Sequence, residues 1–351
     1  MSRVLVVATS RKTRGGITSV VKAHETGEQW KKFHCVWIET HRDGPAWRKI
    51  AYFIWACIEY LFLLPFADIV HIHVGVGFSV IRKMFFAMIA KMLKKRIIIH
   101  FHPASKEHLR NPLYINKYRQ LFDKSDLLIV LSPYWINVVN KTFPNRNYRM
   151  EYLLNPCPIV NRNFSHKENV ILYAGSLIER KGYDRLLKAF ANITNKYPDW
   201  RIDFAGDGNL KKAKKIQEEL KISNSKVQYL GWVTSREKEI VFQRASVYCL
   251  PSRGEGFPMG ILDAIAYGIP VVSTPVGGIG DFMQDGVHGL FYKDAYDIDS
   301  LTENLDKILS SPELRNRIQR QADMLVYGEF DVKNICFRLG CIYTKLLDSA
   351  K

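Results

Sequence analysis

The sequence has no CxxC pair, no cysteine spacing typical of a metal site, no low-complexity segment, and no internal repeat with the period of about 20–50 residues that marks solenoids. Its six cysteines lie mostly in apolar runs, where cysteine packs as a small hydrophobic residue. These absences argue against a disulfide framework, a cysteine zinc module and a repeat protein. Acidic residues are also few, with 34 Asp and Glu against 51 Lys and Arg.

The acid deficit is concentrated in the first half of the chain. Residues 1–160 hold 24 of the 51 basic residues and 10 of the 34 acidic ones, a balance of +14. This leaves 27 basic and 24 acidic residues, a balance of +3, for residues 161–351. An excess of positive charge on one domain predicts an anionic partner, which could be nucleic acid, a membrane surface or a phosphorylated substrate.

One segment of the chain could be mistaken for a membrane span. The apolar run at residues 50–66 has 17 residues, carries Glu59 and is interrupted by Pro65, which puts it at the short limit for a membrane span. We therefore expect a buried helix that leads into the strand DIVHIHV. The opening segment MSRVLVVATS predicts a first strand rather than a signal peptide, so the cytosol is the expected compartment.

Short apolar runs alternate with helical patterns along both halves of the chain. The expected strands are 3–8, 34–39, 68–74, 96–101 and 126–131 in the first half, and 170–176, 201–208, 226–233, 245–252 and 270–278 in the second. This alternation predicts an α/β fold with two parallel sheets, each covered by helices. A segment rich in Asn, Pro and Arg at 152–168 predicts a linker. We expect domains at 1–160 and 161–327, and a C-terminal helix at 328–351 that packs back towards the first domain.

Residues 251–270, PSRGEGFPMGILDAIAYGIP, place two carboxylates around a glycine-rich turn that follows the apolar run ASVYCL. The spacing of apolar residues after the turn predicts a helix, which puts Glu255 at its start and Asp263 two turns further along. Free backbone N–H groups at a helix start favour anions and hydrogen-bond acceptors. The alternative is that Glu255 is an ordinary helix cap and Asp263 a solvated surface acid.

Other loops of the second half carry cations and glycines at strand ends. Arg180, Lys181 and Gly182 open a helix directly after a strand, which suits a diphosphate, although a basic surface turn would have a similar sequence. AGDG at 205–208 and PVGG at 275–278 end two further strands. Because ligands bind beyond the carboxyl ends of parallel strands, these loops and the acid are expected to converge on one ligand site.

The second half resembles the retaining nucleotide-sugar glycosyltransferases of family 4, in the stretches YAGSLIERKGYDRLLKAF, FAGDG, YLGWV and PSRGEGFPMGILDAIAYGIP. The first half fits the same family more loosely, in RGGITSVV, ADIVHIHVG, IIIHFHP and SDLLIVLSPYW. The resemblance implies the GT-B fold, in which two Rossmann-like domains with parallel sheets face each other across a central cleft. It also implies transfer of a sugar from a UDP- or GDP-linked donor to a hydroxyl group.

The resemblance assigns roles to the residues that match the family's motifs. Glu255 would contact the donor sugar, and Asp263, in place of the usual glutamate, would hold the ribose. Arg180 and Lys181 would bind the diphosphate, and His102 would touch the sugar, whereas His73 and His100 are expected to be structural. The expected catalytic residues are Glu255, His102, Arg180 and Lys181, and the expected donor-binding residues are Gly15, Gly16, Ser176, Arg180, Lys181, Gly206, Glu255, Gly256, Phe257, Pro258 and Asp263.

No cofactor and no metal ion is expected beside the nucleotide-sugar co-substrate, because Arg180 and Lys181 can stabilise the charge on the departing phosphate. The only D-x-D sequence, DID at 297–299, precedes a predicted helix and indicates a helix cap rather than a metal site. The expected acceptor is a saccharide, lipid-linked through a diphosphate, that is extended during the synthesis of an O-antigen, an exopolysaccharide or a related surface polysaccharide.

The first domain is expected to dock on an anionic membrane surface. A helix predicted over 81–96, IRKMFFAMIAKMLKKR, has five basic residues on a solvated face, namely Lys83, Lys91, Lys94, Lys95 and Arg96. Its apolar stripe, expected to face the core, consists of Met84, Phe85, Met88, Ile89 and Met92. Positive charge near an anionic bilayer supports reversible binding. The hypothesis is a cytoplasmic enzyme that lies peripherally on the inner face of the cell membrane.

Other functions compatible with these patterns are kept open. A nucleotide-sugar epimerase or a glycan phosphorylase would share the fold but not the reaction. A basic nucleic-acid-binding protein would be a different class of molecule. It predicts aromatic residues beside Lys and Arg on exposed loops, and no convergence of glycine loops with acids, which the second half contradicts.

Overall fold

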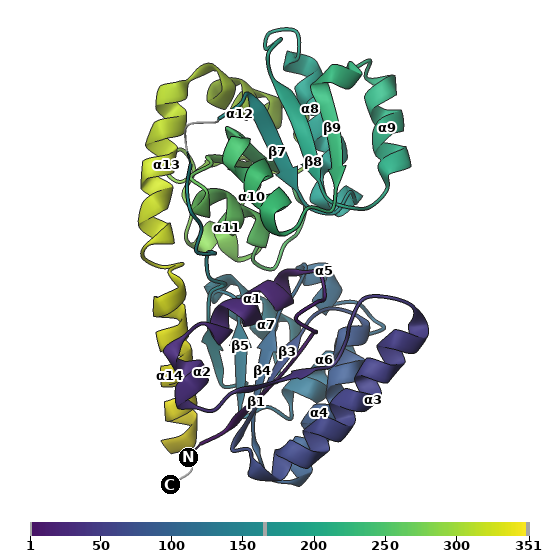
Figure 1. Ribbon diagram of the computed structural model, residues 1–351, viewed down its shortest axis with the longest axis vertical. Coiled ribbons are helices and arrows are strands. Elements are labelled where there is room, and N and C mark those ends of the chain that lie inside the picture. The colour runs from purple at the N-terminus through teal and green to yellow at the C-terminus, as the bar shows by residue number, and fades with distance from the viewer. Residues whose placement is uncertain (1, 164–166, 349–351) are drawn as a thin grey trace. The chain divides into compact units, whose positions relative to one another are not determined.

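The computed structural model describes residues 2–163 and 167–348, and these form two α/β units (Figure 1). The first unit comprises Met1–Pro156 together with Phe330–Lys351, and the second comprises Cys157–Glu329. The predicted α/β class with two parallel sheets is therefore confirmed. Residues 164–166, which belong to the predicted linker, lie outside the described residues.

The first unit is built on a six-stranded sheet of order β2-β1-β3-β4-β5-β6 in which neighbouring strands are parallel. Its strands are β1 (Val4–Ala8), β2 (Val36–Glu39), β3 (Ile69–Val74), β4 (Arg96–Phe101), β5 (Leu127–Val130) and β6 (Met150–Tyr152). Its helices are α1 (Gly16–Glu25), α2 (Glu28–Lys32), α3 (Ala46–Leu63), α4 (Phe78–Met92), α5 (Lys106–Leu109), α6 (Ile115–Phe122), α7 (Pro133–Thr142) and α14 (Val332–Asp348), with a 3₁₀ turn at η1 (Leu64–Phe66).

The second unit repeats this plan with the sheet order β12-β11-β10-β7-β8-β9, again with parallel neighbours. Its strands are β7 (Val170–Ala174), β8 (Arg201–Ala205), β9 (Val227–Gly231), β10 (Val247–Leu250), β11 (Val271–Ser273) and β12 (Leu290–Phe291). Its helices are α8 (Tyr183–Ile193), α9 (Leu210–Glu219), α10 (Ser235–Arg244), α11 (Met259–Ala266), α12 (Ile298–Ser310) and α13 (Pro312–Val326), with 3₁₀ turns at η2 (Glu179–Lys181), η3 (Asn224–Lys226) and η4 (Gly277–Asp281).

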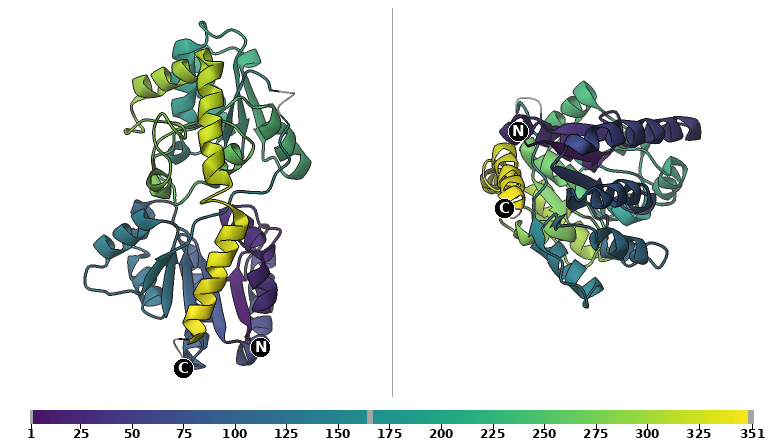
Figure 2. Two further views of the ribbon diagram at one scale, coloured as in Figure 1. Left: turned by 90° about the vertical axis from the view of Figure 1, so that its left-hand side faces the viewer. Right: turned by 90° about the horizontal axis from the view of Figure 1, so that it is seen from below.

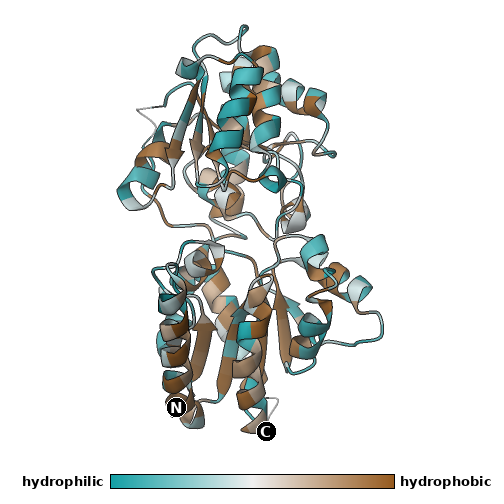
Figure 3. Cartoon of the chain, turned by 90° about the vertical axis from the view of Figure 1, so that its right-hand side faces the viewer, coloured by the Kyte–Doolittle hydropathy of each residue, from teal (hydrophilic) through white to brown (hydrophobic). Residues whose placement is uncertain are grey.

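The central strands of both sheets are buried on both faces, as expected for parallel strands covered by helices. Figure 3 shows the strands of the first unit as continuous hydrophobic bands. Each predicted strand exists, usually shortened by one to four residues at its ends, and β6 and β12 were not predicted. These two strands have three and two residues, so an apolar run long enough to reveal them is lacking.

The last helix of the chain, α14, belongs to the first unit, where it packs against α1 and α2 (Figure 2). Its apolar stripe, Ile335, Leu339, Ile342 and Leu346, is buried. Tyr343 of the same helix is hydrogen-bonded through its hydroxyl to Nδ1 of His71 on β3, at 2.7 Å. The first unit is thus assembled from both ends of the sequence.

The prediction of a buried helix at residues 50–66 is wrong. The helix exists as α3 and η1, but Ala56 and Tyr60 are the buried residues of α3 and most of its large apolar side chains are exposed. Figures 1 and 2 show α3 at the outside of the first unit, so one face of the helix meets the rest of the unit. A run that is apolar on every side indicates a helix but leaves its burial undetermined.

The predicted faces of the helix over 81–96 are also wrong in part. The helix is α4, which ends at Met92, and Arg96 already belongs to β4. Lys83 is buried rather than solvated, and its Nζ donates to Oγ1 of Thr40 at 2.6 Å. Met88 and Met92, expected in the core, are exposed. The buried face of α4 is instead Val80, Lys83, Phe86, Ala87 and Ala90.

Candidate functional site

Two loops of the second unit meet because their strands are neighbours. β7 pairs with β10 in parallel, so the residues that follow both strands emerge at the same edge of the sheet. The segment 175–182 follows β7 and contains the 3₁₀ turn η2, whereas the segment 251–258 follows β10 and leads into α11. We call the second segment the Glu255 loop. Pairing of the strands brings together charged residues that are 74 positions apart in the sequence.

Glu255 is held by three side chains at this edge. Nζ of Lys181 lies 2.8 Å from Oε1 and 3.0 Å from Oε2 of the carboxylate, and Nη1 of Arg180 lies 3.5 Å from Oε1. The hydroxyl of Ser252 donates to Oε1 at 2.8 Å. The Glu255 side chain is only 8% exposed, and a carboxylate buried to this degree needs such charged and hydrogen-bonding partners. The structure therefore brings Arg180, Lys181 and Glu255 into one cluster, as the sequence predicts.

Backbone contacts fix the two segments against each other. Arg180 also donates from Nη1 to the carbonyl of Gly254, and the N–H of Arg253 donates to the carbonyl of Arg180 at 2.8 Å. Arg185, in the first turn of α8, is almost fully buried and donates to the carbonyls of Pro251 at 2.7 Å and Glu179 at 3.0 Å. One guanidinium thus joins the turn that carries the cations to the loop that carries the acid.

Two glycines allow the loops to approach this closely. Gly182 has φ +83°, and a Cβ built on it would lie 2.1 Å from the carbonyl oxygen of Pro251. Gly277 has φ +65°, and its Cβ would lie 2.2 Å from the carbonyl oxygen of Glu255. Both positions combine a left-handed backbone with contacts that leave no room for a side chain, so the sequence can place only glycine there without strain.

The other residues predicted from the second half lie around the same edge. Gly206 follows β8, and a Cβ on it would lie 2.0 Å from the carbonyl oxygen of Gly175. Ser176 follows β7, and its carbonyl accepts a hydrogen bond from the Tyr173 hydroxyl at 2.9 Å. Gly256, Phe257 and Pro258 complete the Glu255 loop: the Gly256 carbonyl accepts from Gly278, Phe257 is buried against Phe282, and Pro258 is the N-cap of α11.

Asp263 lies on α11 and forms an ion pair with Lys238 of α10, with Nζ 2.7 Å from Oδ1. Burial raises the pKa of the Asp263 carboxyl, and the ammonium of Lys238 partly opposes that shift. The described contacts of Asp263 do not include Glu255, Arg180 or Lys181. A ligand hydroxyl at Asp263 would therefore share the carboxylate with Lys238, a partner that the sequence analysis did not identify.

Gly15, Gly16 and His102 belong to the first unit. Gly15 is the N-cap of α1 with φ +136°, and Gly16 is the first residue of that helix. His102 follows β4 and its Nε2 lies 2.9 Å from Nδ1 of His73. Burial is the main cause that lowers the pKa of His102 to about 3, with a smaller effect from His24, so its imidazole is neutral at physiological pH. The roles that the resemblance gives to these three residues stay predictions.

Three buried histidines of the first unit, His71, His73 and His100, are candidate metal ligands because their ring nitrogens lie within 4.8 Å of one another. Nδ1 of His71 is bonded to Tyr343 and its Nε2 lies 3.3 Å from Nδ1 of His100, whereas His73 is bonded to His102. The rings of His71 and His100 are stacked with an interplanar angle of 7° rather than directed at a common point. The arrangement fits a hydrogen-bonded layer between the sheet and α14 better than a tetrahedral metal site.

Asp297 shows that the DID segment is a helix cap, as predicted. Its Oδ1 accepts a hydrogen bond from the N–H of Ser300 at 2.9 Å, in the first turn of α12. The same carboxylate also accepts from the Ser300 hydroxyl at 2.6 Å. Its oxygens are therefore engaged in capping contacts.

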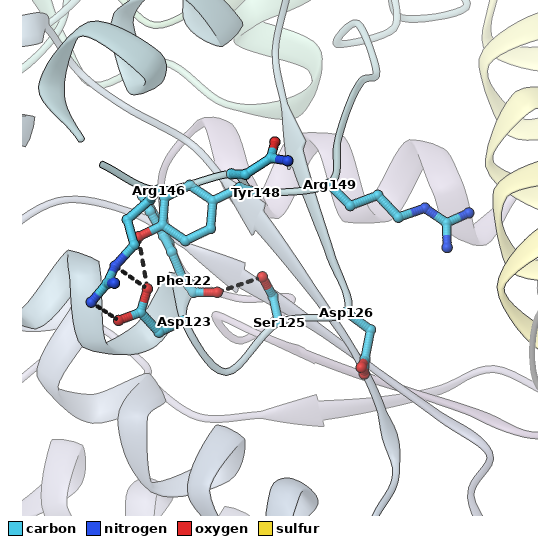
Figure 4. Close-up of a pocket in the computed structure, with 8 residues that line it drawn as sticks. Phe122, Asp123, Ser125, Asp126, Arg146, Tyr148 and Arg149 are labelled. Atoms are coloured by element: carbon cyan, nitrogen blue, oxygen red, sulfur yellow. Dashed lines mark hydrogen bonds and ion pairs between the residues drawn. The ribbon is translucent and has the colours of Figure 1, made fainter. Parts of the chain in front are cut away.

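A pocket of about 450 Å³ in the first unit lies at the wrong edge of the sheet to be the ligand site (Figure 4). Its lining comes from the segments that precede β5 and β6, which is the amino-terminal edge of the strands. Within it, the carboxylate of Asp123 is satisfied by Arg146 at 3.2 Å and by the Tyr148 hydroxyl at 3.0 Å. Open α/β sheets bind ligands at the opposite, carboxyl edge.

Sequence reasoning missed Ser252, Arg185 and Lys238. Ser252 follows an apolar strand and had no distinguishing signal, because serine is common at strand ends. Arg185 acts on backbone carbonyls, which no residue type in the sequence marks. Lys238 could have been sought as the partner of a buried acid, but its distance of 25 positions from Asp263 hides the pairing.

Comparison with known proteins adds an independent line of evidence. Residues 159–324 match the family model described as "Glycosyl transferases group 1". The chain is 31% identical over 166 residues to an uncharacterized glycosyltransferase of Haemophilus influenzae, a match that covers 46% of each chain. It is 29% identical over 176 residues to the lipopolysaccharide 1,6-galactosyltransferase of Salmonella typhimurium, which covers 47% of this chain and 48% of that protein. The chain thus spans about half the length of these curated relatives.

Structural similarity extends further than sequence similarity. The crystal structure of Anabaena HepE in complex with UDP and glucose matches 98% of this chain and 100% of its own, with a TM-score of 0.76 and 15% identity. At this identity the match establishes the fold, which is GT-B. Together, the family match and the fold support a glycosyltransferase, and the matched residues 159–324 contain the cluster of Arg180, Lys181 and Glu255.

Proposed function

We propose that the protein is a retaining glycosyltransferase of the family 4 type, which moves a sugar from a UDP- or GDP-linked donor to a hydroxyl group of a saccharide acceptor. The proposal depends on one observation above all. Two cations and one carboxylate, held together at the carboxyl edge of a parallel sheet, lie inside the segment that matches the group 1 glycosyltransferases. A nucleotide sugar presents a diphosphate and a polyhydroxylated ring, which are the chemical complements of these groups.

Arg180 and Lys181 would bind the diphosphate of the donor. Cleavage of the bond between sugar and phosphate leaves negative charge on the phosphate oxygens and an oxocarbenium-like sugar. Preorganised positive charge lowers the energy of that transition state, and losing one such group costs on the order of 10²–10³ in rate. Glu255 would then exchange its ion pairs for hydrogen bonds from hydroxyl groups of the sugar. A carboxylate accepts such hydrogen bonds strongly because it is charged.

Retention of configuration would not require a nucleophile from the protein. The departing phosphate can accept the proton of the acceptor hydroxyl on the same face of the sugar on which the new bond forms. With two cations on the phosphate, neither a metal ion nor another cofactor is needed in this proposal. Asp263 would hold the ribose hydroxyls, sharing its carboxylate with Lys238.

The acceptor that we propose is a lipid-diphosphate-linked saccharide, extended during the synthesis of a surface polysaccharide. The Salmonella relative is a lipopolysaccharide 1,6-galactosyltransferase, which supports a role of this kind. A lipid-linked acceptor would place the enzyme in the cytoplasm, peripherally on the inner face of the membrane. The excess of +14 in residues 1–160 is consistent with an anionic surface as its partner.

The test is a panel of UDP- and GDP-sugars, first as ligands in a thermal-shift assay and then as donors. We expect stabilisation by one nucleotide family, acceptor-dependent release of the nucleoside diphosphate, and a product whose anomeric configuration by NMR equals that of the donor. Loss of release in Glu255→Gln and Lys181→Ala, while both variants keep a cooperative thermal unfolding transition, would assign the reaction to this site. Release of the nucleoside diphosphate at the wild-type rate by both variants would contradict the proposal.

The same experiment separates the competing enzymes of this fold. An epimerase converts the donor sugar without an acceptor, and a phosphorylase consumes inorganic phosphate and a glycan rather than a nucleotide sugar. Either result would overturn glycosyl transfer. Tight binding of nucleic acid, with no response to any nucleotide sugar, would favour the nucleic-acid-binding alternative.

A further inference from the structure

Helix α3 has its apolar side turned to solvent. Seven of its large apolar residues are about half to three-quarters exposed, from 48% at Leu61 to 74% at Phe62, and they are Trp47, Ile50, Ile54, Trp55, Ile58, Leu61 and Phe62. Their spacing of one, three and four residues places them on one side of the helix. Within the described residues 46–63, Lys49 in the first turn is the one charged residue at an exposed position. We call this side the outer face of α3.

The opposite side of α3 is firmly packed in the first unit. Ala56 and Tyr60 are fully buried, and the Tyr60 hydroxyl donates to the carbonyl of Phe86 on α4 at 2.7 Å. The ring of Phe53 meets those of Phe85 and Phe86 with centroid distances of 6.3 and 6.0 Å. By length and composition, residues Ala46–Phe66 could cross a bilayer. A span would be surrounded by lipid, whereas these contacts hold one side of the helix against the protein.

The exposed apolar surface continues beyond α3. Phe66 in η1 and Met92 at the end of α4 are 65% and 74% exposed. Nζ of Lys95 donates to the carbonyl of Pro65 at 2.8 Å, which ties the turn after α4 to η1. Soluble monomers rarely expose contiguous apolar patches of this extent, so a patch of this kind marks an interaction site.

Charge around the outer face indicates the partner. Residues 42–96 contain nine Lys and Arg and three Asp and Glu, a balance of +6 that becomes +5 without the buried Lys83. Lys91 and Lys94 are exposed beside Met92 at one end, and Arg48 and Lys49 lie in the first turn of α3 at the other. An apolar strip flanked by cations is complementary to the interface of an anionic bilayer. Two such faces would repel each other, which disfavours a second copy of the chain as the occupant.

We propose that the outer face of α3 is the surface by which the protein lies on an anionic phospholipid bilayer, with the helix axis in the membrane plane. This inference rests on the proposed function where it assigns the docked enzyme a lipid-linked acceptor. Trp47 and Trp55 lie two turns apart on that face, and their amphipathic rings suit the level of the lipid headgroups. Docking would therefore depend on insertion of α3, and the exposed cations Lys91 and Lys94 beside the end of α4 would add attraction.

The experiment uses sedimentation of the full-length protein with vesicles of phosphatidylcholine alone and of an equimolar mixture with phosphatidylglycerol. Trp55→Ser/Phe62→Ser removes two exposed side chains of the outer face, so folding is unaffected. Phe337→Ser is the matched control, because Phe337 lies on α14 of the same unit and is 73% exposed. We expect the wild type and the control to bind the anionic vesicles, and the double variant to bind at least about tenfold more weakly, since each ring contributes burial of apolar area.

Three results would overturn the inference. These are equal binding by the double variant and the control, equal binding of the wild type to both kinds of vesicle, and a lipid-free dimer that the double variant loses. Donor hydrolysis measured without vesicles separates the two proposals. A wild type that binds vesicles but turns over no nucleotide sugar leaves this surface in place and rejects the proposed function. Turnover by the double variant without vesicle binding would support both proposals, because the site in the second unit would be active while the loss of docking would be assigned to α3.

Discussion

Lys181 and Glu255 are ion-paired, with Nζ 2.8 Å from Oε1, although the resemblance assigns them to different parts of a nucleotide sugar. In this cluster the acid neutralises the cation that would bind the diphosphate. Binding of a donor then requires an exchange, in which phosphate replaces the carboxylate on the cations and sugar hydroxyls replace the cations on the carboxylate. Both groups keep a partner throughout, so neither is left buried and unpaired.

Glu255→Gln should separate catalysis from nucleotide binding. The amide keeps the size of the side chain and removes the charge that competes for Lys181 and Arg180. We expect turnover to fall by about 10²–10³ while the affinity for the nucleoside diphosphate stays equal or rises. Calorimetric titration and nucleotide release measure the two effects. Glu179→Gln is the matched control, because Glu179 lies in η2 beside Arg180 and Lys181 but its exposed side chain pairs with Lys212. A parallel loss of affinity in Glu255→Gln would contradict the exchange.

Arg185→Met should weaken the contact between the two loops of the candidate site. Arg185 donates to carbonyls of both loops, and its loss leaves buried acceptors unpaired. We expect the free energy of unfolding to fall by about 2–4 kcal/mol and nucleotide affinity to fall with it. Lys188→Met, at an exposed position of the same helix, should change neither. Urea unfolding and nucleotide titration test this, and full affinity in the Arg185 variant would show that the two loops do not need this link.

Asp263→Asn should reduce discrimination for the ribose. If the carboxylate accepts a ribose hydroxyl, the wild type binds the ribonucleoside diphosphate more tightly than its 2′-deoxy analogue, by about tenfold for one hydrogen bond to a charged group. The Asn variant should bind the two more nearly equally. Glu237→Gln, at an exposed position on the same helix as Lys238, is the control. An unchanged ratio in the Asn variant would remove Asp263 from the nucleotide site.

The free energy of unfolding should fall in mild acid because the first unit contains five buried histidines. Burial lowers the pKa of His24 to about 4 and that of His102 to about 3, and it lowers the pKa values of His71, His73 and His100 well below the usual value. The unfolded chain therefore binds protons below pH 6.5 that the folded unit does not, so the stabilisation is complete above that pH and decreases as the pH falls. Each histidine that stays neutral in the folded unit lowers the free energy of unfolding by about 2 kcal/mol at pH 5.

Urea unfolding between pH 7.5 and pH 5 measures this dependence. His24→Gln should make the dependence shallower, whereas His34→Gln, at an exposed position, should leave it unchanged. Equal stability at both ends of the range would show that the five imidazoles are not neutral and buried together.

The sequence was sufficient for the architecture and for the main cluster of the site. Glycines and charges at the ends of apolar runs fall at one sheet edge, because parallel strands all end there, and this placed Arg180, Lys181 and Glu255 together. Periodicity could not show which side of α3 faces solvent, since the helix is apolar on nearly every side. It also could not reveal Lys238 beside Asp263, or Arg185 beside Pro251, because such pairs arise from helix packing and from backbone acceptors.

The bond between His71 and Tyr343 joins residues 272 positions apart, and it has a consequence for synthesis on the ribosome. Residues 157–329 form a unit of their own and can fold as soon as they have emerged. The unit that begins the chain must wait, with the histidines of β3 and β4 uncovered, until α14 has been translated. The first unit is therefore begun before the second unit but completed after it.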